Sequence, residues 1–263
     1  MPIADLADTT IFYTDEGSGP PVVLVHGWTC DSHDWSWQIP SLLANHRVVA
    51  MDLRGHGRSG VPEAGYTPKQ FAADVLAVLD QLGIDRAVFV GHSLGGVIVS
   101  TIAVEHPDRV AAVVAVDPAY GVDPSLLPMI EMMRDTFDVA PLDAAGIAFA
   151  IFYTDDTPAH LRTWHERRLA GDPPHVVRDT FLNIYFGPDA WAARPAADAY
   201  LARRSCPTFA VYADEGRSEL DRVLLGEDGR FEVWPEAGHF LHQEQPDRFN
   251  ALLAGWLTEL DPW

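Results

Sequence analysis

The chain has 263 residues, 48% of them hydrophobic, and this length suits one α/β domain with an insertion better than two independent domains. Its formal net charge of −20 would repel nucleic-acid phosphates and anionic lipid surfaces, which are bound by clustered Lys and Arg side chains. The two cysteines, Cys30 and Cys206, lie far apart in sequence, which argues against a disulfide framework or a zinc knuckle. We therefore expect neither nucleic acid nor a membrane as a partner.

The amino-terminal residues contain no basic segment followed by an apolar one, and no stretch approaches the roughly 18 apolar residues of a membrane-spanning helix. The sequence therefore predicts a cytoplasmic protein. It does not decide between a monomer and a homo-oligomer.

Short β-rich runs alternate with helical patterns along much of the chain, and this alternation predicts βαβ units and a mainly parallel sheet. Residues 67–82 place apolar side chains on one helical face, and Gly83 ends that helix. A similar apolar stripe predicts a closing helix over residues 247–260. The predicted strands are 10–14, 22–25, 47–51, 87–90, 110–116, 208–212 and 231–234.

The segment 118–205 interrupts this alternation. It is rich in Met, Trp, Tyr, Pro and Asp, and residues 125–137 and 158–170 have helical patterns. We therefore predict a core formed by residues 1–117 and 206–263, with a helical cap (lid) at 118–205 inserted after the sixth strand.

Residues 91–95 read Gly-His-Ser-Leu-Gly, after an apolar run and before a helical pattern. This is a nucleophile-elbow pattern, in which a sharp turn between a strand and a helix lifts a serine hydroxyl above the edge of the sheet. The flanking glycines let the backbone fold back without a Cβ clash. Ser93 is therefore the candidate nucleophile.

A serine nucleophile needs a base within hydrogen-bonding reach and a third group that orients the base. His239 follows the last predicted strand and precedes the closing helix. Loops at the carboxyl ends of parallel strands share one rim of the sheet, so His239 can face Ser93 despite their separation in sequence. We therefore assign His239 as the candidate base.

Taken together, these motifs make the chain resemble the α/β-hydrolase fold family, over residues of about 10–117 and 205–260. The motifs are His26-Gly27-Trp28, the Asp-Leu-Arg-Gly-His-Gly-Arg-Ser run at 52–59, the elbow, and Gly238-His239. The resemblance implies an eight-stranded, mainly parallel sheet flanked by helices. It also implies an oxyanion hole formed by the backbone N–H groups of Trp28 and Leu94, and no cofactor.

The third member of a catalytic triad has three candidates. The common family position, a few residues beyond strand 208–212, falls here on Gly216, so Asp214 or Glu215 would have to serve from a shifted turn. A second position known in the family, at the end of the sixth strand, corresponds to Asp117. We favour Asp117 and keep Asp214 as the main alternative.

The predicted cap should set the substrate. Its aromatic side chains, among them Tyr153, Trp164 and Trp191, would line a pocket for a lipophilic or aromatic molecule, although aromatic residues at helical spacing are more often core. The acidic and histidine residues of this segment match no standard ligand spacing, so we assign no metal.

The leading hypothesis is a serine hydrolase that cleaves a carboxylic ester or lactone of a small molecule through Ser93, His239 and Asp117 and an acyl-enzyme. Dehalogenation and epoxide hydrolysis are disfavoured because those branches of the family use an aspartate nucleophile. The alternative is a cofactor-free dioxygenase with His239 as the substrate base, although that pattern has a histidine where this chain has Cys30. A non-enzymatic receptor on the same fold is a third hypothesis.

Overall fold

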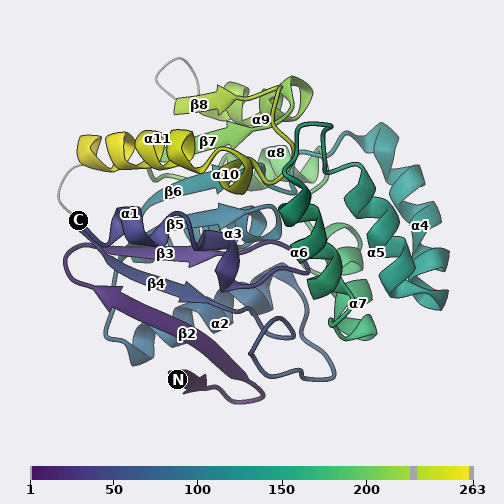
Figure 1. Ribbon diagram of the computed structural model, residues 1–263, viewed down its shortest axis with the longest axis horizontal. Coiled ribbons are helices and arrows are strands. Elements are labelled where there is room, and N and C mark those ends of the chain that lie inside the picture. The colour runs from purple at the N-terminus through teal and green to yellow at the C-terminus, as the bar shows by residue number, and fades with distance from the viewer. Residues whose placement is uncertain (1, 226–229, 261–263) are drawn as a thin grey trace.

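The computed structural model describes residues 2–225 and 230–260, which fold around one eight-stranded sheet (Figure 1). The strand order is β1-β2-β4-β3-β5-β6-β7-β8. β2 pairs antiparallel with β1 and β4, and all other pairs are parallel. The predicted mainly parallel α/β sheet is therefore confirmed.

The described elements have the following bounds. The strands are β1 Ile3–Asp5, β2 Thr10–Gly17, β3 Pro21–Val25, β4 Arg47–Met51, β5 Ala87–His92, β6 Val110–Val116, β7 Thr208–Tyr212 and β8 Arg230–Val233. The α-helices are α1 Ile39–Leu42, α2 Pro68–Gln81, α3 Leu94–Glu105, α4 Leu127–Val139, α5 Pro141–Ala150, α6 Ala159–Leu169, α7 Pro174–Tyr185, α8 Ala196–Leu201, α9 Glu215–Leu225, α10 Leu241–Glu244 and α11 Pro246–Glu259. Short 3₁₀ helices span Ser32–Trp35, Pro107–Arg109 and Pro124–Leu126.

Helices cover both faces of the sheet, so its central strands are buried on both sides. In β3, Val23 and Val25 belong to the core beneath α2 and α3, whereas Val22 and Leu24 belong to the core beneath α1 and α11. This division follows from the alternation of side chains along a strand. All seven residues of β6 are buried, which explains its unbroken Val-Ala sequence.

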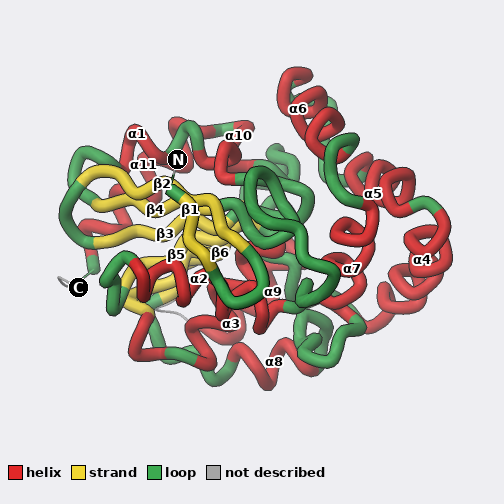
Figure 2. The backbone as a smooth tube through the Cα atoms, turned by 90° about the horizontal axis from the view of Figure 1, so that it is seen from below, coloured by secondary structure: helices red, strands yellow, loops and turns green. Residues whose placement is uncertain are grey.

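The helices inserted after β6 form a separate group beyond the carboxyl ends of the strands. Figures 1 and 2 both show α4, α5, α6 and α7 gathered there, while α8 returns to pack against α3 and α9. This arrangement agrees with the predicted helical insertion and places it over the rim where the motif residues lie.

The state of the two cysteines and the presence of membrane-spanning helices can also be read from the fold. Cys30 is buried, Cys206 is half-buried, and both are free thiols. No helix in residues 2–225 and 230–260 is long and apolar enough to cross a membrane.

Candidate active site

Ser93 occupies the sharp turn between β5 and α3. Its backbone has φ 52° and ψ −113°, a region that residues with a side chain rarely adopt. The turn depends on close backbone approaches, since a Cβ on Gly91 would lie 2.2 Å from the carbonyl oxygen of Gly95. A Cβ on Gly95 would lie 2.2 Å from the carbonyl oxygen of Val25. The glycines at both flanks are therefore sterically required, and Ser93 lines a cavity of about 420 Å³.

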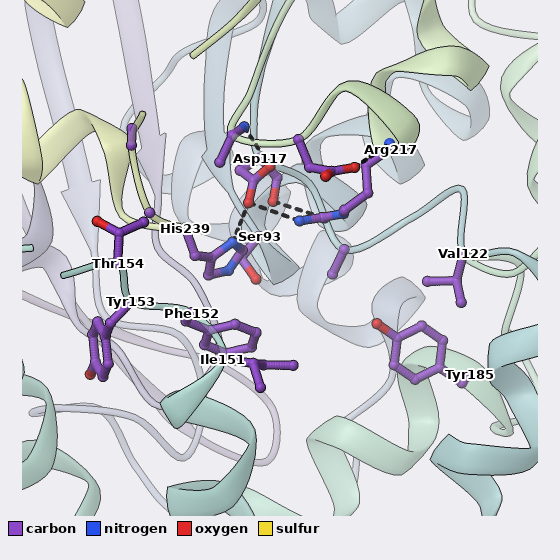
Figure 3. Close-up of a pocket in the computed structure, with 15 residues that line it drawn as sticks. Ser93, Asp117, Val122, Ile151, Phe152, Tyr153, Thr154, Tyr185, Arg217 and His239 are labelled. Carbon is purple, nitrogen blue, oxygen red and sulfur yellow. Dashed lines mark hydrogen bonds and ion pairs between the residues drawn. The ribbon is translucent and has the colours of Figure 1, made fainter. Parts of the chain in front are cut away.

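His239 lies in the loop between β8 and α10 and lines the same cavity. Figure 3 shows its ring beside the side chain of Ser93, with a contact on its far side to Asp117. The backbone N–H of His239 donates to the carbonyl of Phe152 in the insertion, at 2.8 Å. Nδ1 of His239 contacts Oδ2 of Asp117, which leaves Nε2 as the ring nitrogen available toward Ser93.

Asp117 is buried at the end of β6. Its Oδ1 accepts the N–H of Ala213 at 3.1 Å, and its Oδ2 accepts from Nη1 of Arg217 at 2.8 Å. Burial by itself would raise the pKa of Asp117, but the charge of Arg217 and the hydrogen bonds from His239 and the backbone N–H of Ala213 hold that pKa well below its ordinary value. The carboxylate is therefore ionised at neutral pH and held from three directions.

The other two acid candidates point elsewhere. Oδ1 of Asp214 accepts the N–H of Arg217 in the first turn of α9, at 3.0 Å. Glu215 is exposed and contacts Arg222. Among the described residues, neither carboxylate forms a hydrogen bond with His239, whereas Asp117 does. Asp214 still lines the cavity, so it can influence the charge there.

Arg217 is the residue of this site that sequence reasoning missed. It stands directly after Gly216, the position that corresponds to the usual acid of the family, and donates to Asp117 at 2.8 Å and to the carbonyl of Pro118 at 2.5 Å. A signal was present, because an arginine directly after the usual acid position can pair with a carboxylate at the end of the neighbouring strand. That reasoning would have favoured Asp117.

The loop after β3 passes next to the nucleophile. A Cβ on Gly27 would lie 3.3 Å from Cβ of Ser93, so this loop cannot carry a side chain there without moving. Among the described residues, the backbone N–H groups of Trp28 and Leu94 have no hydrogen-bond acceptor. The indole of Trp28 instead donates to the carbonyl of Val177 in α7, at 2.9 Å. The oxyanion-hole role of these two N–H groups stays a prediction.

His92 holds the backbone of the candidate base, His239, in place. Its Nε2 lies 2.9 Å from the carbonyl oxygen of His239, and a carbonyl only accepts, so this nitrogen carries the proton and donates. Burial, together with the neighbouring His242 and His239, lowers the pKa of His92 well below its ordinary value. His92 is therefore a neutral structural residue, as its buried place on the elbow suggests.

The predicted pocket residues divide between the cavity and the core. Tyr153 lines the cavity, but Trp164 and Trp191 do not. Trp191 is only 5% exposed, and its Nε1 donates to Oγ1 of Thr101 on α3 at 3.1 Å. Trp164 is 48% exposed and lines a second cavity. These two predicted pocket residues therefore lie outside the cavity that Ser93 lines.

The rest of the cavity wall is largely apolar. Its apolar side chains come from the loop after β6, the segment after α5 and the end of α7, and Figure 3 shows several of them facing the cavity. They are Ala119, Val122, Ile151, Phe152 and Tyr185. Among the described residues, no group of three or more His, Cys, Asp or Glu is arranged to hold a metal ion.

Comparison with known proteins identifies the family. The family model described as the alpha/beta hydrolase fold matches residues 20–246, and this chain belongs to that family. The chain is 29% identical to a non-heme haloperoxidase of Rhodococcus erythropolis, over 98% of this chain and 99% of that protein. It is 32% identical to epoxide hydrolase A of Mycobacterium tuberculosis, over 94% and 92% of the two chains.

Solved structures give the same result. Est816, described as an N-acyl homoserine lactone degrading enzyme, superposes with a TM-score of 0.82 at 26% identity, over 97% of this chain and 99% of that one. The chain is thus an enzyme of the α/β-hydrolase family. Its relatives carry names of several different activities, so the reaction has to be argued from the site.

Proposed function

We propose that this protein is a serine hydrolase that cleaves a carboxylic ester or lactone through Ser93, His239 and Asp117. One observation carries the proposal. An ionised, buried carboxylate contacts Nδ1 of His239, whose ring lies beside a serine on a strained elbow. These are the three roles that activation of a serine requires: nucleophile, base and a group that orients the base.

The chemistry proceeds in two halves. Nε2 of His239 accepts the proton of Ser93 as Oγ attacks the carbonyl carbon, and His239 then gives that proton to the departing alkoxide oxygen. Water next attacks the acyl carbon while His239 takes a proton from it, and Oγ of Ser93 leaves and recovers that proton. With a lactone, the alcohol produced in the first half remains attached to the acyl chain.

The backbone N–H groups of Trp28 and Leu94 would hold the negative oxygen that forms at each attack. Their lack of other acceptors supports this role. Donors of this kind contribute about 10²–10³ in turnover each, because they are already oriented before the charge develops. The role needs only backbone atoms, which leaves the Trp28 indole free to pack against the insertion.

The cavity favours an uncharged, lipophilic acyl group. Its volume of about 420 Å³ lies within the range typical of small-molecule sites, and Val122, Ile151 and Phe152 contribute apolar surface. Asp117 and Asp214 outnumber the one guanidinium, Arg217, among its charged side chains. This balance, on a chain of net charge −20, disfavours a substrate that is itself an anion.

Two other activities are less compatible with the residues. Epoxide hydrolysis, the activity in the name of one relative, would need an aspartate at the elbow, and residue 93 is serine. A cofactor-free dioxygenase would use His239 on the substrate, but Cys30 stands where that pattern has a histidine. Burial raises the pKa of Cys30 far above its ordinary value, so the thiol stays protonated and cannot replace that base.

A panel of activated esters and lactones of graded acyl size, assayed in parallel with an oxygen electrode, tests the proposal. We expect hydrolysis without oxygen uptake in the wild type and its loss in Ser93→Ala. Hydrolysis that persists in a folded Ser93→Ala variant would contradict the proposal. Oxygen consumption that depends on His239 and not on Ser93 would favour the dioxygenase.

A further inference from the structure

The loop that carries His239 is held from the insertion as well as from the core. The backbone N–H of His239 donates to the carbonyl oxygen of Phe152, just after α5, at 2.8 Å. The phenyl ring of Phe152 also lies against the imidazole (Figure 3), with 4.4 Å between the ring centroids and 34° between the ring planes. The position of the candidate base therefore depends on the position of the insertion.

One carboxylate joins these two parts of the chain. Glu244 is the last residue of α10. Its Oε2 accepts the backbone N–H of Gly238, the residue before His239, at 2.7 Å. Its Oε1 accepts from the hydroxyl of Thr157, in the insertion, at 3.0 Å. Glu244 thus contacts the loop of the base with one oxygen and the insertion with the other.

The contact with Thr157 leads back to Phe152 through a short turn. The hydroxyl of Thr157 accepts the backbone N–H of Thr154 at 2.9 Å, and the N–H of Thr157 donates to the carbonyl of Thr154 at 3.1 Å. A threonine hydroxyl commonly closes a turn in this way. Thr157 is only 5% exposed, so the turn is buried where it meets Glu244. The hydrogen bonds therefore form a bridge from Gly238 through Glu244 to the segment 152–157.

The junction around Gly238 is closely packed. A Cβ at this position would lie 2.5 Å from Oε1 of Glu244, 2.7 Å from the carbonyl oxygen of Phe152 and 3.2 Å from Oγ1 of Thr157. Any side chain there would have to push the insertion away from the core. The glycine before the candidate base is therefore required by the same three residues that form the bridge.

The chemistry of the bridge suits a carboxylate. Both oxygens of Glu244 accept from neutral donors, one N–H and one O–H. An ionised carboxylate only accepts hydrogen bonds, so its two oxygens match this pair of donors. Gly238 is buried, and removal of the carboxylate would leave its N–H without a partner unless the loop moved.

We propose that Glu244 is a positioning residue, which holds the loop of His239 and the segment 152–157 together as one unit. The base then keeps its place between Ser93 and Asp117. Phe152 lines the cavity, so the bridge also couples the cavity wall to the base. This inference rests on the role of His239 as the base in the proposed function.

Hydrolysis of the best activated ester from the panel, compared between Glu244→Ala and Glu244→Gln, tests the proposal. Alanine removes both contacts, and turnover should fall about tenfold or more, because small displacements of a catalytic group have effects of this size. The glutamine oxygen can accept the N–H of Gly238 while its NH₂ group donates to Thr157, so Glu244→Gln should stay within about threefold of wild type. Glu236→Ala is the matched control and should leave turnover unchanged, since Glu236 is an exposed residue of the same loop that pairs with Arg248.

Thr157→Val removes only the contact on the side of the insertion and should lower turnover about threefold. The double variant of Glu244→Ala and Thr157→Val should lose no more than Glu244→Ala alone, because both changes break one bridge. Hydrogen exchange of the folded variants gives a readout that does not depend on activity. In Glu244→Ala, residues 238–240 and 152–157 should lose protection together, and in Glu236→Ala neither segment should.

Wild-type turnover in a folded Glu244→Ala variant would overturn the proposal. So would an equal loss in Glu244→Gln, losses that multiply in the double variant, or loss of protection in only one of the two segments. If Glu244→Ala does not fold, exchange in Thr157→Val decides: lost protection at His239 supports the bridge, and unchanged protection overturns it. If Ser93→Ala keeps its hydrolytic activity, the proposed function fails, whereas the exchange measurements still test the bridge.

Discussion

Replacement of Asp117 by asparagine separates the three acid candidates. In the wild type, one carboxylate oxygen accepts from Ala213 N–H and the other faces His239 and Arg217. An amide has only one acceptor oxygen, so the Asp117→Asn side chain must turn its NH₂ group either toward Ala213 or toward the imidazole and guanidinium. If the NH₂ group faces Ala213, it meets the backbone N–H of that residue, and two donors then oppose each other. The second orientation favours the imidazole tautomer with its proton on Nε2, which cannot accept the serine proton.

The expected loss is about 10⁴-fold in turnover, or about 5 kcal/mol of transition-state stabilisation, as in the worked serine-protease case. The assay is the hydrolysis rate of the best activated ester from the panel, with circular dichroism as the folding check. Asp214→Asn is the control, since asparagine also caps helices well and should keep turnover within about threefold. The reasoning is refuted if Asp214→Asn loses orders of magnitude while Asp117→Asn stays near the wild-type rate.

Three further predictions follow from individual contacts. Arg217→Gln removes a charged hydrogen bond of 2.8 Å to the acid and should lower turnover about tenfold, whereas turnover within about twofold of wild type would contradict this. Gly95→Ala forces a backbone clash and should lower the free energy of unfolding by about 3 kcal/mol or more, so an unchanged Tm would count against the elbow geometry. Burial raises the pKa of Asp172 to about 7, so the folded state binds more protons than the unfolded state and loses stability as pH rises from about 4 to about 7. The free energy of unfolding of Asp172→Asn, measured with urea, should therefore rise relative to that of the wild type as the pH increases through this window. A difference between the two proteins that does not change with pH would refute the prediction.

The elements around the elbow were predictable because local constraints determine them. A Cβ on Gly91 or Gly95 would lie 2.2 Å from a backbone carbonyl oxygen, so both positions require glycine. The sequence shows this requirement directly. The strands were predictable because β6 is buried on both faces and therefore unbroken in its apolar character. The sheet order then gathers Ser93 and His239 at one rim.

The triad acid and the cavity-lining residues were harder to predict, because they depend on how helices and strands that are distant in sequence pack together. Asp117 and Asp214 follow neighbouring parallel strands, and only the folded contacts separate them: Asp214 accepts the backbone N–H of Arg217, whereas Asp117 contacts His239. Trp191 and Tyr153 are both aromatic residues of the insertion, but Trp191 packs on α3 and Tyr153 faces the cavity. Composition cannot separate them, since it does not say which face of a helix meets the core.

Covalent labelling by a serine-directed fluorophosphonate, with the modified peptide identified by mass spectrometry, tests the central claim most directly. The proposed mechanism predicts one label on the peptide that contains residues 91–95, none on that peptide in Ser93→Ala, and much slower labelling in Asp117→Asn. A folded wild-type protein that takes no label, or a Ser93→Ala variant that labels as fast as wild type, would contradict the assignment of Ser93 as the nucleophile.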